Sequence, residues 1–405
     1  MDSQIIIIGG GASGMMAAGM AAQRGLRTIL IEKNPVLGRK LLLTGKGRCN
    51  LTNYCEVDEL IENIPVNGKF LTNAFYKFSS KETISFFNKL GLEIKVERGK
   101  RVFPASDKAK DVIEVLIKFV VSNGVNVIHS SALDIMKFGK IFAVKLQNGE
   151  VIRGNKLIIA TGGKSYPGTG STGDGYKFAR KFGHTIKKYK PSLVPIEAKH
   201  EWAPRADELL LKNVAIKILD KNNKVVYKDS GEMFFTKFGV SGPVILSASS
   251  HVRNIKNHKL FIDLKPALSE EKLDIRIQRD FNEYSRKQFK AVLKNLLPNK
   301  LVPIIIELSK IPARKQVHQI TKEERKNLVF LLKNLSLKLD KFRSIKEAIV
   351  TSGGVDVKEI APKTMESKLV PGLYFAGEVI DVDGHTGGFN LQIAWSAGFV
   401  AGSSV

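Results

Sequence analysis

The strongest constraint on the fold lies near the start of the chain, where four isoleucines precede closely spaced glycines. Ile5–Ile8 is a β-branched apolar run that predicts a short strand buried on both faces. Gly9, Gly11 and Gly14 follow at G-x-G-x-x-G spacing, and Met15–Arg24 has the small and unbranched residues of a helix packed on a sheet. This order of strand, glycine turn and helix predicts the start of a βαβ unit.

Each glycine of the turn has an expected role in binding a dinucleotide. Gly9 allows the tight turn, Gly11 lets a pyrophosphate approach the backbone, and Gly14 lets helix and strand pack closely. The free N–H groups at the helix N-terminus would then face the phosphates. A second apolar strand, Thr28–Ile31, ends at Glu32, whose carboxylate would accept hydrogen bonds from a ribose. We predict dinucleotide binding, with a purely structural βαβ turn as the alternative.

Two further stretches add to this signal. Leu37–Asn53 is too rich in glycine and basic residues for a helix or a central strand, so we expect a loop along the ligand or an ordinary charged loop. Gly372–Glu378 reads as a strand that ends in an acid, and Gly387–Gly398 as a glycine turn that opens a helix. In two-segment FAD domains such a helix faces the pyrimidine end of the flavin. This second signal favours FAD over NAD as the tightly held cofactor.

The middle of the chain predicts insertions. A hairpin with an Asn148-Gly149 turn and the apolar strand Lys156–Ala160 belong with the first βαβ unit, and Gly170–Gly175 opens a helix that Asp174 would cap, unless this acid lies near the flavin. Ser269–Lys333 predicts helices. The predicted strands of a small β-domain around them are Val214–Leu219, Lys224–Tyr227, Met233–Phe235, Leu260–Leu264 and Leu335–Phe342.

The fold class expected is therefore α/β. A glutathione-reductase-type, Rossmann-like FAD-binding domain (1–190 and 347–405) would carry a small β-domain (191–265 and 335–346), which itself carries a helical domain (266–334).

Charge is the unusual part of the composition. The formal net charge is +25, and residues 253–346 hold 23 Lys and Arg against 10 Asp and Glu. This excess is not a stripe and lacks interleaved aromatic residues, so we interpret it as a solvated lysine-rich surface, which makes a nucleic-acid partner an unlikely first choice. The alternatives are a field that steers an anionic substrate or NAD(P)H, and a flavoprotein that acts on or binds nucleic acid. No apolar run is long enough to span a membrane, and two cysteines fit a reducing cytoplasm.

The sequence resembles the BaiN-like, aminoacetone-oxidase-like NAD(P)/FAD-dependent flavoproteins. The matching stretches run from end to end, and Gly38–Asn53 and Gly372–Gln392 are the most specific of them. The resemblance implies an oxidoreductase with the three-part fold described above, in which the inserted β-domain (191–265 and 335–346) is β-barrel-like. Its members act on substrates as different as small amines and steroid-like enones, so it implies no particular substrate.

The resemblance also implies non-covalent FAD contacts at matching positions. These are Gly9, Gly11, Ala12, Ser13, Gly14, Glu32, Lys33, Arg39, Lys40, Gly45, Gly47, Arg48, Cys49, Asn50, Thr161, Gly162, Gly377, Asp381, Gly388, Asn390 and Leu391, and the candidate set also includes Ala132, Glu378 and Phe389.

Candidates for catalysis are few. His385 lies in a loop before the predicted flavin-facing helix and could donate a proton, and Ser352 could line the substrate site. Each has a purely structural alternative: His385 as a solvated loop histidine, and Ser352 as part of an interdomain turn. No histidines share a metal-ligand spacing, so no metal site is expected. The sequence predicts an FAD-dependent oxidoreductase that transfers hydride between flavin and a small or medium organic substrate, with NADH, NADPH or dioxygen as second substrate. A non-catalytic flavin-binding module is a further alternative.

Overall fold

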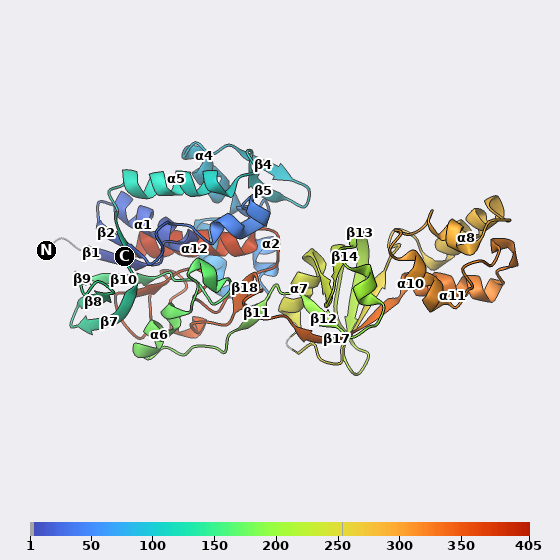
Figure 1. Ribbon diagram of the computed structural model, residues 1–405. Helices are drawn as coiled ribbons and strands as arrows, with labels where there is room; N and C mark the ends of the chain where they lie inside the picture. Colours follow the sequence, from blue (N-terminus) through green and yellow to red (C-terminus); the bar gives the residue numbers. More distant parts are fainter. Residues whose placement is uncertain (1–3, 253) are drawn as a thin grey trace. The chain divides into compact units, whose positions relative to one another are not determined.

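The computed structural model describes residues 4–252 and 254–405 (Figure 1). The chain forms two compact units, one of residues 1–192 with 344–405 and one of residues 193–343. Each unit has its own cluster of buried apolar side chains. No helix of the described residues is long and apolar enough to cross a membrane.

A five-stranded parallel sheet organises the first unit. Its strand order is β19-β10-β1-β2-β6, and every neighbouring pair is parallel. The isoleucines of β1 are at most 5% exposed, which confirms the strand predicted to be buried on both faces. The bounds are β1 (Gln4–Ile8), β2 (Arg27–Glu32), β6 (Asn126–His129), β10 (Lys156–Ile159) and β19 (Leu373–Phe375).

Helices α1 (Ala12–Gln23), α5 (Ala109–Ser122) and α12 (Phe389–Ser404) lie side by side along the sheet (Figure 1). Helices α1 and α12 approach closely because small residues separate them. A Cβ atom at Gly398 would lie 2.5 Å from the Ser13 carbonyl oxygen, and one at Gly402 would lie 2.3 Å from that of Ala17. Two helices far apart in the sequence therefore share one layer of the cofactor unit.

A three-stranded antiparallel sheet lies on the side of the parallel sheet away from α5 (Figure 1). The hairpin predicted around Asn148-Gly149 is confirmed as β8 (Ile141–Leu146) and β9 (Val151–Gly154). Strand β7 (Ala132–Phe138) was not predicted, because its sequence mixes apolar and charged residues and most of its side chains stay partly exposed.

The remaining elements of this unit are short. Leu41–Gly47, predicted as loop, forms 3-10 turns, although Thr44, Gly45 and Lys46 leave helical geometry in its middle. The run of three leucines allows the tight turns, and the glycine breaks them. The other elements are α2 (Val57–Glu62), α3 (Thr72–Lys77), α4 (Ser80–Lys89), α6 (Asp174–Lys181), β3 (Thr52–Asn53), β4 (Ile94–Glu97), β5 (Arg101–Pro104), β11 (Lys190–Ser192) and β18 (Val350–Ser352).

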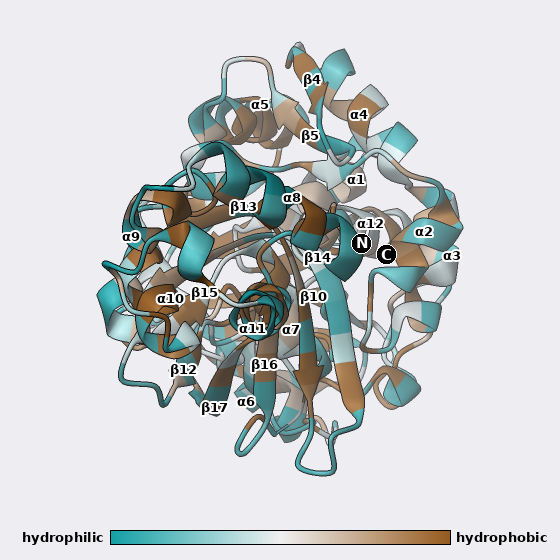
Figure 2. Ribbon diagram, turned by 90° about the vertical axis from the view of Figure 1, so that its right-hand side faces the viewer, coloured by the Kyte–Doolittle hydropathy of each residue, from teal (hydrophilic) through white to brown (hydrophobic). Residues whose placement is uncertain are grey.

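The second unit contains a closed six-stranded barrel of order β12-β15-β14-β13-β16-β17. In Figure 2 its long strands change between hydrophobic and hydrophilic residues along their length. This pattern fits strands with one face towards a barrel core. The bounds are β12 (Ile196–Ala198), β13 (Leu210–Leu219), β14 (Val225–Thr236), β15 (Gly239–Ser241), β16 (Lys259–Asp263) and β17 (Leu335–Phe342).

Four helices lie between β16 and β17 in the sequence: α8 (Glu270–Glu283), α9 (Phe289–Leu293), α10 (Val302–Ser309) and α11 (Lys322–Lys333). The expected α/β fold class, with an inserted barrel that carries inserted helices, is thus confirmed. Two details were wrong. The strands predicted at Lys224–Tyr227 and Met233–Phe235 are one strand, β14, and α7 (Pro243–His251) was not predicted. We propose the three-domain division given by the sequence as the domain organisation.

Gly14 shows how tightly the first turn is packed. A Cβ atom there would lie 1.8 Å from the carbonyl oxygen of Gly9. Gly14→Ala should therefore lower the free energy of unfolding by about 1–3 kcal/mol, because the turn or the helix must shift. Urea denaturation of the flavin-free protein measures this. Gly25→Ala is no suitable control because its φ is +79°, whereas Gly168→Ala is one, since no atom lies within 4 Å of its Cβ position. Equal stability of the Gly14 and Gly168 variants would contradict the close packing.

Candidate functional site

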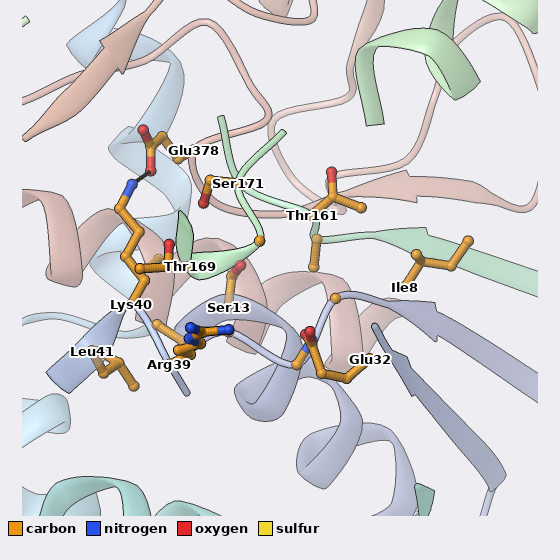
Figure 3. Close-up of a pocket in the computed structure, with 18 of the residues that line it drawn as sticks. Ile8, Ser13, Glu32, Arg39, Lys40, Leu41, Thr161, Thr169, Ser171 and Glu378 are labelled. Carbon is orange, nitrogen blue, oxygen red and sulfur yellow. Dashed lines mark hydrogen bonds and ion pairs between the residues drawn. The ribbon is translucent and has the colours of Figure 1, made fainter. Parts of the chain in front are cut away.

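A cavity opens in the first unit where β1 and β10 end (Figure 3). It holds about 1300 Å³ of space, including solvent at its mouth, and its lining comes from both ends of the chain. Of the candidate cofactor residues, the structure brings these to the cavity wall: Gly9, Gly11, Ala12, Ser13, Glu32, Lys33, Arg39, Lys40, Ala132, Thr161, Gly162, Glu378, Asn390 and Leu391.

The glycine turn leaves the start of α1 open to the cavity. Gly9 has a φ of +108°, and a Cβ there would meet the Ala160 carbonyl oxygen at 2.5 Å. At Gly11, by contrast, a Cβ would meet no atom within 4 Å. Gly11 is the N-cap of α1, and no side chain caps this helix. The N–H groups of its first turn are therefore available to an anion in the cavity.

Glu32 holds the opposite side of the turn. Its carboxylate is 7% exposed and accepts hydrogen bonds from the Gly10 N–H at 2.7 Å and from the Asn34 N–H at 2.7 Å. The Asn34 side-chain amide donates to it as well, at 2.6 Å. Glu32 thus fixes the shape of the turn, in addition to the ribose contact expected of it.

Lys40 and Glu378 form an ion pair across the cavity wall, with 2.6 Å between Nζ and Oε2 (Figure 3). Lys40 also donates to the Ser165 hydroxyl at 2.6 Å, and this hydroxyl donates to Glu378 at 2.9 Å. The Thr351 N–H completes the set with a bond of 2.8 Å to Glu378. Sequence reasoning missed Ser165 and Thr351, because only the fold brings them to residues 40 and 378.

A second ion pair lies at the cavity wall near α6. Lys33 contacts Asp174 at 2.6 Å and also donates to the Thr172 hydroxyl. Gly173 is the N-cap of α6, and no side chain caps that helix, so the expected capping role of Asp174 is wrong. The acid is bound instead by the lysine, which crosses from the end of β2.

The N-terminus of α12 lies at the same cavity through Asn390 and Leu391. Gly388, its N-cap, has a φ of +106°, and a Cβ there would lie 2.3 Å from the Thr52 backbone. The Asn390 side chain accepts from the Gly384 N–H and donates to the Gly384 and His385 carbonyls. Because these bonds occupy the amide, only the backbone N–H groups of α12 remain to face a ligand.

Ten candidate cofactor residues do not line the cavity: Gly14, Gly45, Gly47, Arg48, Cys49, Asn50, Gly377, Asp381, Gly388 and Phe389. The Arg48 guanidinium pairs with Glu97 and with Asp107 at 2.7 Å, and lies 3.9 Å from the centre of the Phe103 ring. It therefore fastens β4 and β5 to the preceding loop. Burial raises the pKa of the Cys49 thiol to about 12, which keeps it protonated and unreactive.

The two candidate catalytic residues also lie outside the cavity lining. The His385 ring nitrogen Nδ1 lies 3.1 Å from the Asn63 side-chain oxygen, and its backbone N–H donates to the Asn63 carbonyl. Ser352 is buried in β18, which pairs with β11. Val382, three residues before His385, does line the cavity, so the loop that holds His385 borders the site.

Asp383 is a buried acid in this loop that sequence reasoning missed. It is 0% exposed, and its carboxyl oxygen accepts from the Ser192 hydroxyl at 2.7 Å. Burial raises the pKa of Asp383 to about 6 from its ordinary value of 3.8. The carboxyl is thus neutral in the folded protein at mildly acidic pH.

Asp383→Asn should change the pH dependence of stability. Since the folded state binds this proton more tightly than the unfolded chain, wild-type stability falls as pH rises from about 4 to about 6. The neutral amide of the variant does not titrate. Between pH 4 and pH 6 the free energy of unfolding of the variant should therefore rise by up to about 3 kcal/mol relative to that of the wild type. Urea denaturation at several pH values measures the difference. A constant difference between pH 4 and pH 7 would contradict a raised pKa.

The donors at the cavity fit a dinucleotide cofactor. The buried Thr161 hydroxyl has no hydrogen-bond partner among the described residues, and Thr161 lines the cavity. Two helix N-termini without side-chain caps reach it, and Gly11 leaves room for a phosphate beside the backbone. No group of three or more His, Cys, Asp or Glu in the described part of the chain could hold a metal ion.

Known proteins are similar in sequence to this chain over nearly its full length. The chain is 32% identical to a 3-dehydro-bile acid delta(4,6)-reductase of Clostridium scindens, covering 99% of this chain and 98% of that protein. It is 33% identical to a ribosomal RNA dihydrouridine synthase of Escherichia coli, covering 97% and 95%. A protein of the same description from Haemophilus influenzae is 31% identical, covering 100% and 98%.

Solved structures support the fold. A flavocytochrome c3 fumarate reductase matches with a TM-score of 0.52 at 15% identity, covering 99% of this chain and 78% of that chain. A 3-ketosteroid-delta4-(5alpha)-dehydrogenase of Rhodococcus jostii RHA1 matches with a TM-score of 0.50 at 12% identity, covering 99% and 97%. The family described as HI0933-like protein Rossmann domain matches residues 3–404. The chain therefore belongs to this HI0933-like family, the BaiN-like flavoprotein oxidoreductases that its sequence resembles.

Proposed function

We propose that this chain is an FAD-dependent reductase of a carbon–carbon double bond conjugated to a carbonyl, and that the double bond belongs to uracil in RNA. One observation carries the first part: two helix N-termini and the Gly9–Ser13 turn meet at a single cavity in a family of oxidoreductases. When bound, FAD would take a hydride from NADH or NADPH and pass it to the β-carbon of the double bond, while a proton adds at the α-carbon.

The residues of the cavity supply position and charge for FAD. The first turn of α1 and Arg39 would hold the pyrophosphate, and Glu32 the adenosine ribose. Lys40 and Glu378, joined as an ion pair, would contact the ribityl chain. The first turn of α12 would face the pyrimidine edge of the ring. Of the remaining candidate residues, we propose His385 and Ser352 as the first to test for proton transfer and substrate contact.

The names of the relatives describe one kind of chemistry. A delta(4,6)-reductase and a dihydrouridine synthase both saturate a ring double bond, conjugated to a 3-oxo group in one case and to the uracil carbonyl in the other. The net charge of +25 favours RNA as the substrate, since a polyanion gains far more from it than a bile acid with a single carboxylate. RNA, the alternative in the sequence interpretation, is therefore our first choice, and a free enone is the second. The cytoplasm, where RNA and NAD(P)H occur together, is the proposed location.

The experiment incubates the FAD-loaded protein and NADPH or NADH with unmodified ribosomal RNA transcript, and separately with a 3-oxo-Δ4 steroid. Mass spectrometry of the digested RNA should find uridine heavier by two hydrogens, and the steroid should stay unchanged. Reduction of the steroid alone would overturn the RNA assignment. If neither NADPH nor NADH is oxidised and both substrates stay intact, the proposed reductase activity itself is wrong.

A further inference from the structure

The helical part of the second unit carries a surface that the proposed reaction does not use. Two segments far apart in the sequence, 285–290 and 313–318, lie side by side there. The Phe289 N–H donates to the Lys315 carbonyl at 2.8 Å, and the Lys290 N–H to that of Ala313 at 3.1 Å. The Val317 N–H donates to the Lys287 carbonyl at 3.1 Å. We call this paired structure the basic strap.

Five cations are exposed on the basic strap and on the helix that follows its first segment. They are Arg286, Lys287, Lys290, Lys294 and Arg314. None of them forms an ion pair with a carboxylate within the part of the chain that the structure describes, residues 4–252 and 254–405. No direct ion pair among the described residues therefore neutralises their positive charge.

Three acids of the surrounding helices, Asp274, Asp280 and Glu324, are engaged by other cations. Lys315 binds Glu324 at 2.7 Å, and Arg325 binds Asp274 at 2.7 Å. Arg276 binds Asp280 at 3.0 Å. Glu283, at the end of α8, raises the pKa of the neighbouring Tyr284 hydroxyl. Because the three acids are paired with other cations, the five cations of the strap form a positive surface. Figure 2 shows the neighbouring helix α8 in largely hydrophilic colours.

The strap is fixed in place and carries an aromatic ring. Phe289 and Val317 are 0% and 1% exposed, so they anchor both segments in the apolar core of the unit. The Lys287 ammonium lies 4.7 Å from the centre of the Tyr284 ring, which is partly exposed. Cations beside an aromatic face suit a nucleic acid, since phosphates pair with the former and a base can stack on the latter.

We propose that the basic strap binds the phosphates of the RNA substrate, an assignment that rests on the proposed function. A lipid surface is a poorer fit, because it would need exposed apolar side chains, and the large apolar residues of the strap are buried. Binding at a site built from phosphate contacts positions an RNA without reading its sequence. Base choice would then be left to the cavity of the first unit.

The test replaces four strap cations by glutamine: Arg286→Gln, Lys287→Gln, Lys290→Gln and Arg314→Gln. The matched control makes the same charge change on exposed residues of the first unit: Lys118→Gln, Lys140→Gln, Lys145→Gln and Arg153→Gln. Fluorescence anisotropy measures the affinity for a ribosomal RNA fragment between 50 and 200 mM salt. Over this range a protein that binds through several phosphate contacts loses roughly 10³-fold or more in affinity. FAD content and the rate of flavin reduction by NADPH are measured in parallel.

The strap variant should bind the RNA at least about 10-fold more weakly and lose about 2–4 units of the logarithmic salt slope, with FAD content unchanged. Wild-type affinity in the strap variant, or an equal loss in the control, would overturn the proposal. So would strap-dependent flotation with phosphatidylglycerol vesicles while RNA binding stays intact. If RNA binds through the strap and no uridine is reduced, the proposed function fails and the surface assignment stands.

Discussion

Gly11→Val should abolish tight flavin binding while the protein keeps its fold. The φ of Gly11 is −84° and its ψ −168°, an extended conformation that valine adopts readily. A Cβ there meets no protein atom within 4 Å, so the new side chain projects into the cavity instead of into the core. It would occupy the approach of the pyrophosphate to the start of α1. We expect FAD affinity to fall by about 10²–10³-fold, or roughly 3–4 kcal/mol.

Titration of the flavin-free protein with FAD, followed by flavin fluorescence, measures this loss. Urea denaturation of the flavin-free variant should match that of the wild type. Gly14→Ala, in the same motif, should behave in the opposite way. Its Cβ would lie 1.8 Å from the Gly9 carbonyl oxygen, so this variant should lose free energy of unfolding, which Gly11→Val keeps. Undiminished FAD affinity in Gly11→Val would place the pyrophosphate elsewhere, and the turn would then be structural.

The glycine turn could be predicted from the sequence because its determinants are local. Four buried isoleucines, three glycines and an acid after the second strand follow each other within 32 residues, and each does what its chemistry dictates. The late signal from Gly372 to Gln392 was equally local, and Asn390 and Leu391 from this stretch line the cavity. The alternation in Leu335–Phe342 predicted a returning strand of the inserted β-domain, which β17 confirms, whereas closure into a barrel was implied only by the family resemblance.

Contacts between distant segments could not be predicted in this way. Ser165 and Thr351 join Lys40 and Glu378 only after the chain has returned from the second unit. Arg48 was expected among the FAD contacts, but Glu97 and Asp107 bind its guanidinium. The charge of residues 253–346 seemed dispersed along the sequence, yet folding brings 285–290 beside 313–318, where Arg286, Lys287, Lys290 and Arg314 form no ion pair with any described carboxylate.

Gly388→Ala should weaken flavin binding and lower its two-electron potential, because the substitution moves the start of α12. A residue with a side chain is strained at a φ of +106°, and its Cβ would lie 2.3 Å from the Thr52 backbone. Strain and overpacking together should cost about 2–5 kcal/mol of stability. Displacement of the helix N-terminus removes about 0.3–2 kcal/mol from the anionic reduced flavin, or roughly 6–40 mV.

Gly402→Ala is the matched control, since it disturbs the other end of the same helix. Its Cβ would lie 2.3 Å from the Ala17 carbonyl oxygen, which is as severe as the contact at Gly388. Gly402, however, lies in the last turn of α12, whereas Gly388 directly precedes the first turn, where Asn390 and Leu391 line the cavity. Both variants should therefore lose stability in urea, and only Gly388→Ala should change the potential in an anaerobic dye titration. Equal potentials in both variants and the wild type would mean that α12 supports the cavity wall without acting on the flavin charge. A fall in both would trace the effect to the packing of α12 on α1, where the small residues that join these helices also position the pyrophosphate turn.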